Sequence, residues 1–144
     1  MRSGGDTRGD PRLTVVIADR HDLVRRALTD LIDVEPGFAV VAQAPDQDSL
    51  AAELGRRRPS LVLVEPAVLG TGGLKHLPRL LTLSPQTRAV VLSDESSEAL
   101  ERHAHGWGAV ATIIKHAAPD ELFRVLRHAV GRPLTLAPET PGGA

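Results

Sequence analysis

The run Leu61–Val64 (LVLV), followed directly by Glu65 and Pro66, decides the fold class. All four residues of the run are apolar, so a strand built from them would be hydrophobic on both faces and would be buried on both. Strands that are apolar on both faces are typical of parallel sheets covered by helices on each side. We therefore expect Leu61–Val64 to be an inner strand of such a sheet, with Glu65 at its carboxyl end.

Similar short apolar runs recur along the chain and alternate with helix-like segments. The further runs are Leu13–Ala18, Phe38–Ala42, Ala89–Leu92 and Val110–Ile114. The helical segments extend from Asp22 to Val34, from Asp48 or Ser49 to Arg57, from Gly73 to Leu83, from Ser96 to His105 and from Pro119 to Gly131. Right-handed crossovers turn this alternation into an α/β fold, a doubly wound five-stranded parallel sheet of order 2-1-3-4-5 in a three-layer sandwich.

The composition excludes several kinds of function. The chain has 144 residues, 42% of them hydrophobic, a formal net charge of −1, no cysteine and 2% aromatic residues. These values indicate a folded domain without thiolate chemistry, and they argue against a base-stacking surface for single-stranded nucleic acid. No apolar run is long enough to span a bilayer, and residues 1–12 lack the apolar core of a signal peptide. We therefore expect a cytoplasmic protein without membrane contact.

Three parts are expected along the chain. Residues 1–12 are polar and glycine-rich, which is typical of a flexible tail. Residues 13–131 hold all the predicted strands and helices. Residues 132–144 are rich in proline and glycine and are typical of a linker. The chain is then either a segment of a longer regulator, which we favour, or a complete single-domain protein.

Ionisable and hydroxyl side chains follow four of the predicted strands. Asp19 and Arg20 end the first strand, Glu65 the third, Ser93 the fourth and Lys115 the fifth. In a doubly wound sheet the functional site lies at the carboxyl ends of the strands, beside the point where the strand order reverses. We therefore expect these five side chains to meet at one edge of the sheet.

Four segments carry a resemblance to a known family. They are residues 17–28 (IADRHDLVRRAL), 59–74 (PSLVLVEPAVLGTGGL), 89–96 (AVVLSDES) and 108–122 (GAVATIIKHAAPDEL). Together they resemble the receiver domain of two-component response regulators of the NarL/LuxR type, which has the CheY-like, or flavodoxin-like, fold. The resemblance implies a pocket where two adjacent acids and an aspartate hold magnesium, and where that aspartate accepts a phosphoryl group from a histidine kinase.

Carried over by position, the resemblance gives an incomplete pocket. Asp19 matches the first acid, Ser93 and Lys115 match the hydroxyl and lysine that bind phosphoryl oxygens, but Arg20 replaces the second acid. Glu65 replaces the phosphate-accepting aspartate. Thr112 stands where the family has an aromatic switch residue on the last strand.

Charge explains why these replacements matter. The family pocket, with three carboxylates and one lysine, carries about −2 and favours a hard dication. Here two carboxylates face two cations, so the charge is about zero. We expect the Arg20 guanidinium to pair with Glu65 or Asp19 and to take the place of the metal ion, leaving the domain without metal or other cofactor. Glu65 either imitates a phosphorylated aspartate or only neutralises the cations.

The predicted function is therefore a degenerate receiver that does not depend on phosphorylation and is not an enzyme. It would act as the N-terminal regulatory and dimerisation module of a bacterial transcriptional regulator, with DNA bound only by a C-terminal domain absent from this chain. Two alternatives are a sensor that binds a small molecule in the former phosphorylation pocket and a conventional phosphorylated receiver. Trp107 is either a dimer contact or a cover over the aliphatic core.

Overall fold

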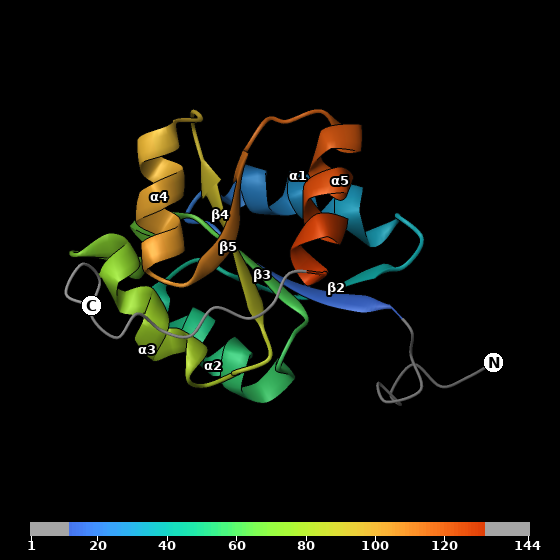
Figure 1. Cartoon of the computed structure of the whole chain (residues 1–144). Helices are drawn as coiled ribbons and strands as arrows, with labels where there is room; N and C mark the ends of the chain where they lie inside the picture. The colour runs from blue at the N-terminus through green and yellow to red at the C-terminus, as the bar shows by residue number, and fades with distance from the viewer. Residues whose placement is uncertain (1–11, 132–144) are drawn as a thin grey trace.

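The computed structural model describes residues 12–131, and Figure 1 shows their arrangement. The expected tail and linker, residues 1–11 and 132–144, lie outside the described residues. The strands are β1 (Leu13–Ala18), β2 (Phe38–Ala44), β3 (Leu61–Val64), β4 (Arg88–Ser93) and β5 (Ala109–Ile114). The α-helices are α1 (Asp22–Asp33), α2 (Gln47–Arg57), α3 (Leu77–Leu81), α4 (Glu98–Gly106) and α5 (Pro119–Val130), with 3₁₀ turns η2 (Pro66–Leu69) and η3 (Gly73–His76).

The five strands form one parallel sheet in the order β2-β1-β3-β4-β5, which confirms the predicted topology. The inner strand β3 is buried at every position, as its unbroken apolar run predicts. Because all strands run in the same direction, their carboxyl ends lie along one edge of the sheet. The strand order reverses between β1 and β3, so the residues that follow these two strands flank the crevice where ligands bind in such sheets.

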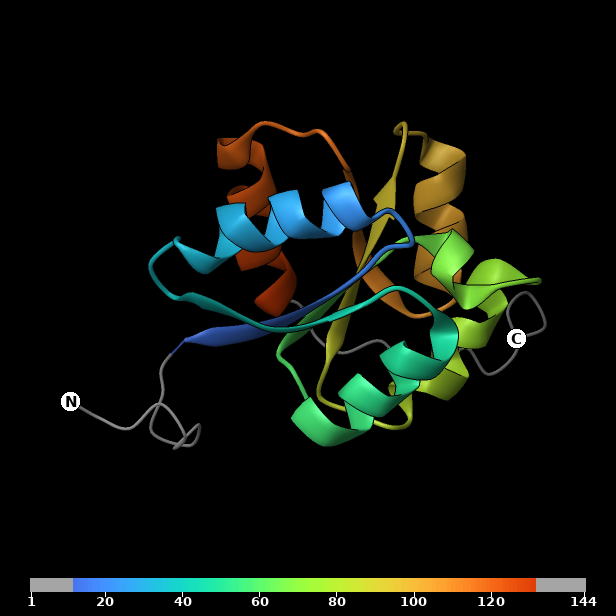
Figure 2. The ribbon, with the colours of Figure 1, turned by 180° about the vertical axis from the view of Figure 1, so that it is seen from behind.

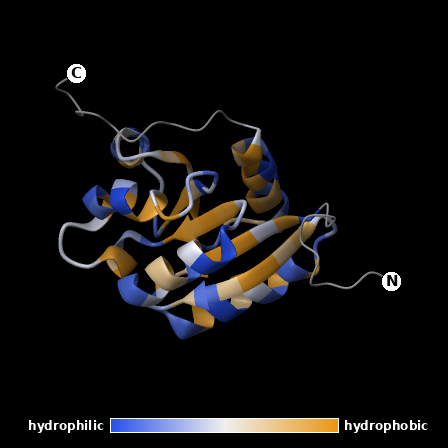
Figure 3. Cartoon of the chain, turned by 90° about the horizontal axis from the view of Figure 1, so that it is seen from below, coloured by the Kyte–Doolittle hydropathy of each residue, from blue (hydrophilic) through white to orange (hydrophobic). Residues whose placement is uncertain are grey.

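Helices cover both faces of the sheet. Figures 1 and 2 show α1 and α5 on one face and α2, α3 and α4 on the other. Each face has its own aliphatic core: Leu28, Ile32 and Leu126 belong to the first, and Leu50 and Leu77 to the second. Figure 3 shows hydrophobic strands between helices whose outer surfaces are hydrophilic. No helix among residues 12–131 is both long and apolar enough to cross a membrane.

The residue that caps the start of α2 differs from the sequence-based prediction. The cap of α2 is Asp46, not Asp48 or Ser49: its carboxylate accepts the backbone N–H of Ser49 at 2.8 Å. Ser49 takes part as the reciprocal partner, since its hydroxyl lies 3.4 Å from the Asp46 backbone nitrogen. This exchange satisfies two backbone donors that have no partner inside the helix.

The expected single helix from Gly73 to Leu83 is wrong. A 3₁₀ turn, η3, comes first, and α3 is only five residues long. Gly72 and Gly73 have positive φ values of 95° and 54°, a conformation that right-handed helices exclude. Pro78 has no N–H group and lies in the first turn of α3, where that group is not needed, as expected.

Candidate functional site at the carboxyl edge of the sheet

Three ionisable residues, Asp19, Glu65 and Lys115, directly follow β1, β3 and β5. Each extends the parallel hydrogen-bond pattern of the sheet by one backbone hydrogen bond. The backbone N–H groups of Asp19, Glu65 and Lys115 donate to the last residues of neighbouring strands. The acceptor carbonyls are those of Ala44 at 3.1 Å, Ala18 at 2.9 Å and Ser93 at 2.9 Å. These bonds hold the three side chains at one edge, as the sequence predicts from the positions of the strand ends.

Lys115 lies between the two carboxylates. Its Nζ donates to Oε2 of Glu65 at 2.7 Å and is 3.1 Å from Oδ2 of Asp19. The exposed fractions of the three side chains are 10% for Lys115, 8% for Glu65 and 0% for Asp19. Charges so far from water are stable only when paired, so this ammonium and the two acids depend on one another.

The other oxygen of Glu65 binds the loop after β1. Oε1 accepts the backbone N–H of Arg20 at 2.9 Å, and the Arg20 Nε lies 3.5 Å from the same atom. The expected pairing of Arg20 with Glu65 is confirmed. The Arg20 side chain is 56% exposed, however, and the cation between the acids is the Lys115 ammonium rather than the guanidinium. Lys115, which follows β5, is 10% exposed, so of the two cations it is the one withdrawn from water.

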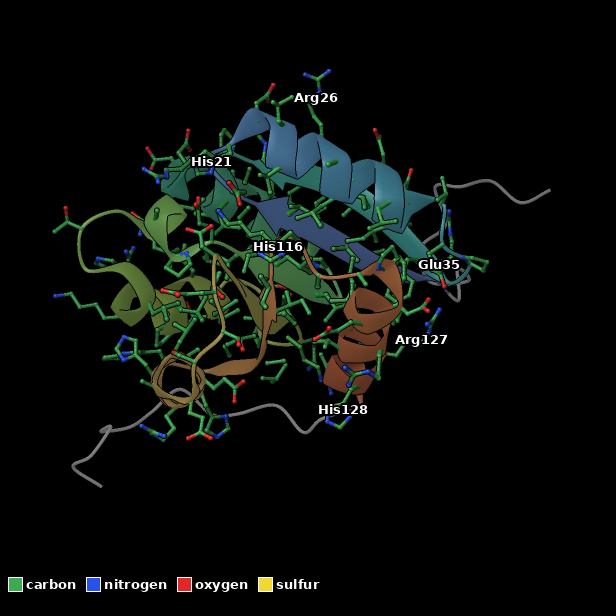
Figure 4. The ribbon with its side chains drawn as sticks, turned by 90° about the horizontal axis from the view of Figure 1, so that it is seen from above. His21, Arg26, Glu35, His116, Arg127 and His128 are labelled. Atoms are coloured by element: carbon green, nitrogen blue, oxygen red, sulfur yellow. The ribbon has the colours of Figure 1, made fainter. Side chains whose placement is uncertain are left out.

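Asp19 is held mainly by His21, which sequence reasoning missed. Its Oδ1 accepts the backbone N–H of His21 at 2.7 Å and lies 3.0 Å from the ring Nδ1. The same Nδ1 is 3.5 Å from Oε2 of Glu65. Figure 4 shows His21 at the amino-terminal end of α1. A histidine two residues after a strand-ending carboxylate was the signal that could have found it.

A nearly buried arginine fixes the loop that carries these groups. Arg25 of α1 donates from Nη1 to the backbone carbonyl of Asp19 at 2.9 Å and from Nε to Gln43 at 3.2 Å. Its Nη2 binds Asp22 at 2.6 Å. Arg25 thereby joins the ends of β1 and β2 to the first turn of α1, which limits the positions open to the Asp19 carboxylate.

Both charges of the Lys115–Glu65 pair are stabilised in the fold. Burial opposes the charge of Glu65, but hydrogen bonds from the Arg20 backbone and from Lys115 outweigh it and lower the pKa of Glu65. Burial likewise opposes the charge of Lys115, yet its bond to Glu65 and its attraction to Asp19 raise the pKa of Lys115. The pair therefore stays ionised across the neutral pH range.

The remaining predicted residues lie apart from this network. Ser93 is the last residue of β4 and lies at the same edge of the sheet. Its Oγ, however, donates a hydrogen bond to the backbone carbonyl of Glu95 at 2.7 Å and not to Glu65. Thr112 is half-buried on β5 and lines a different cavity, between α4 and α5. Trp107 is also half-buried and packs against the core under α2, α3 and α4. This position agrees with the core-cover interpretation of Trp107, while a dimer contact stays a prediction.

Comparison with known proteins agrees with this geometry. The response regulator receiver domain family matches residues 15–127. The chain belongs to the response regulator receiver family. Response regulator GacA of Pseudomonas aeruginosa is 28% identical over 130 residues, which are 88% of this chain and 59% of that protein. Nitrate/nitrite response regulator protein NarL of Escherichia coli K12 is 27% identical over 129 residues, 86% of this chain and 57% of that protein.

An enzyme also contains a region similar to this receiver. Protein-glutamate methylesterase/protein-glutamine glutaminase 2 of Anaeromyxobacter dehalogenans is 32% identical over 114 residues, 79% of this chain but 33% of that protein. Among solved structures, a LuxR-family response regulator from Aurantimonas superposes with a TM-score of 0.76 at 23% identity, covering 89% of this chain and 91% of that one. The receiver spans from about a third to three fifths of these curated relatives.

The magnesium ion of the family does not fit the residues present here. Lys115, which lies 2.7 Å and 3.1 Å from the carboxylate oxygens, has a counterpart in the family and does not by itself exclude a dication. Arg20 adds a second positive charge at the position where the family has an acid. Magnesium prefers oxygen ligands in near-octahedral geometry, and this edge supplies two carboxylates beside an imidazole. The described residues at this edge thus form a nearly neutral network of two carboxylates, Lys115 and the half-exposed Arg20.

Proposed function

We propose that this receiver is the regulatory module of a bacterial transcriptional regulator and acts by protein–protein contact without accepting a phosphoryl group. The observation that carries the proposal is that Arg20 and Glu65 stand where the family has an acid and the phosphate-accepting aspartate, and that both Glu65 oxygens are bound, one by the Arg20 backbone and one by Lys115. The domain would work in the cytoplasm as a homodimer and would not be an enzyme. DNA would be contacted only by a separate C-terminal output domain.

The replacement of an acid by Arg20 would weaken the main support for phosphoryl transfer, which is a divalent ion held by acids. A divalent ion neutralises the charge that develops on the transferred group, and losing one such stabiliser typically slows a reaction by a factor of about 10² to 10³. In this receiver the cation available is Lys115, which is already bound by two carboxylates. Among residues 12–131, two other basic side chains lie near Glu65, those of Arg20 and His21, and each is 56% exposed.

The acceptor itself is also altered. Glu65 is longer than aspartate by one methylene, about 1.5 Å, so its oxygens extend past the position that in-line attack requires of an aspartate. Both oxygens are already in use, one by the Arg20 backbone and one by Lys115. Thr112, in place of an aromatic ring, has no large side chain that could change between buried and exposed positions.

Beryllofluoride binding tests the proposal. The wild-type protein is mixed with magnesium chloride and beryllofluoride, and amide NMR shifts are followed around Ser93 and Lys115. We expect no saturable shifts. The matched variant Arg20→Asp/Glu65→Asp restores an acid pair and an aspartate acceptor, and we expect it to respond. Saturable shifts in the wild-type protein, or transfer of phosphate from a histidine kinase, would refute the proposal.

A second candidate function is a small-ligand sensor, favoured by a cavity next to the crevice. The cavity measures about 270 Å³ and includes the side chain of Lys115 in its wall. The rest of the wall is almost entirely apolar and comes from α1, β4, β5 and α5; examples are Leu28, Leu92 and Leu122. Such a cavity suits a small apolar molecule. Thermal-shift screening against metabolites tests this function, and a screen in which no compound raises the melting temperature counts against it.

A further inference from the structure

A second cavity lies along the edge strand β5, between α4 and α5. It measures about 310 Å³, a size within the range of small-molecule sites. Figure 1 shows the two helices on either side of β5, which is the last strand in the order of the sheet. Three residues of the wall, Ala104, Ala109 and Ala111, are alanines, and Thr112 stands where the family has an aromatic ring. These small side chains leave open a space that larger ones would fill.

The two helices bring opposite charges to this cavity. α4 contributes the Glu101 carboxylate and α5 the Arg124 guanidinium. The Glu101 side chain has no ion-pair partner among residues 12–131. Arg124 lies 4.0 Å from Glu121, and these two side chains are 71% and 51% exposed. A contact of this length between solvated groups contributes little, so both charges are available to a ligand.

Further hydrogen-bonding groups complete the wall. His105 lies one turn after Glu101 on α4, and His128 lies one turn after Arg124 on α5, where Figure 4 shows it. β5 pairs on one side with β4 and has no strand on its other side in the described sheet. An edge strand presents backbone N–H and C=O groups that a ligand can bind. The cavity therefore combines small apolar side chains with one acid, one base and several hydrogen-bonding groups.

We propose that this cavity binds a small zwitterion, an α-amino acid with an apolar side chain. The ligand's carboxylate pairs with Arg124, its ammonium pairs with Glu101, and its side chain packs against the alanines of the wall. A simple anion is repelled by Glu101 and a simple cation by Arg124, whereas a zwitterion satisfies both. The site shares no wall residue with the 270 Å³ cavity. It goes beyond the proposed function, because it gives the module an input of its own.

Titration of the whole chain with L-leucine, L-phenylalanine and L-tryptophan tests the proposal, by calorimetry and by amide NMR. We expect at least one of them to bind with a Kd of about 1 mM or tighter, with saturable shifts centred on α4, β5 and α5. Each amino acid is compared with analogues that carry one charge. For leucine these are 4-methylpentanoate, which lacks the ammonium, and 3-methylbutylamine, which lacks the carboxylate. Each analogue should bind at least about tenfold more weakly.

Four variants locate the site. Arg124→Gln and Glu101→Gln each remove one charge from an exposed side chain and should weaken binding at least about tenfold. The matched control Arg102→Gln removes an exposed arginine of α4 that is not part of the wall, and it should bind as wild type does. Thr112→Phe places a ring in the cavity, at a position where the family carries one, and should abolish binding.

Several results would overturn the proposal. They are the absence of binding by all three amino acids, equally tight binding of the one-charge analogues, and binding that either charge-removing variant leaves unchanged. Shifts centred on the cavity lined by Leu28 and Leu122 would overturn it as well, because they would place the ligand elsewhere. The proposed function fails on a different result, a response to beryllofluoride around Ser93 and Lys115, neither of which lines this cavity.

Discussion

Two ion pairs at opposite ends of the molecule have the same length and very different surroundings. Lys115–Glu65 at the carboxyl edge and Arg127–Glu35 at the other edge both measure 2.7 Å. The exposed fractions of the side chains are 10% and 8% in the first pair, and 52% and 29% in the second. Figure 4 shows His21, beside the first pair, and Glu35 at opposite ends of α1.

The second pair is supported by aromatic rings instead of by burial. The Arg127 guanidinium carbon lies 5.4 Å from the ring centre of Phe38 and 5.8 Å from that of Phe123. If either Arg127 or Glu35 is removed, water can solvate the charge of the one that remains. At the carboxyl edge a lost partner leaves a charge with little access to water. From this difference we expect burial, rather than distance, to decide how strongly the fold depends on an ion pair.

The largest effect is expected from Lys115→Met. It removes the ammonium between the buried acids Asp19 and Glu65, so we expect the free energy of unfolding to fall by about 3 kcal/mol. Urea denaturation followed by circular dichroism measures this loss. A fall no larger than that of Arg127→Met would contradict the proposed difference between the two pairs.

Glu65→Gln should have an intermediate effect that depends on pH. The pKa of Glu65 is lowered, so its contribution is complete above the ordinary value of 4.5 and is lost as the pH falls through the lowered pKa. We expect the variant to be less stable by about 1–2 kcal/mol at pH 7. The difference from wild type should shrink at pH 3. Urea titrations at both pH values test this, and a difference that grows on acidification would contradict it.

Arg127→Met should lower the free energy of unfolding by less than either of these variants, because its partner Glu35 remains solvated. The loss combines an exposed ion pair with the stacking of the guanidinium on two rings, together about 1 kcal/mol. Arg127→Lys, which keeps the charge but not the planar group, separates the two contributions. If Arg127→Lys is as stable as wild type, the contacts with Phe38 and Phe123 contribute nothing.

The smallest expected effect is that of salt concentration on the coupling energies of the two ion pairs. Raising sodium chloride to about 1 M shortens the screening length to about 3 Å. The coupling energy between Arg127 and Glu35 should fall by a few tenths of a kcal/mol, whereas that between Lys115 and Glu65 should hardly change. Double-mutant cycles at low and high salt measure both. Equal salt sensitivity would show that the carboxyl edge is open to ions.

Much of the fold followed from local patterns. The apolar run Leu61–Val64 predicted a buried parallel strand, and the alternation of such runs with helical segments predicted the strand order. The prediction failed around α3, because Gly72 and Gly73 have positive φ values and the α-helix begins only at Leu77, with Pro78 in its first turn. There, backbone restrictions at single residues outweighed the apolar pattern that suggested a longer helix.

At the site, the sequence by itself determined which charges reach the carboxyl edge, because a residue that follows a parallel strand must lie there. It also showed that Arg20 and Glu65 break the pattern of the family. Only the tertiary structure decided which cation lies between the acids. Arg20 and Lys115 have the same charge, but Lys115 enters the crevice from β5 while Arg20 leaves it toward water. That choice depends on the direction of each side chain from its strand end, which residue order does not specify.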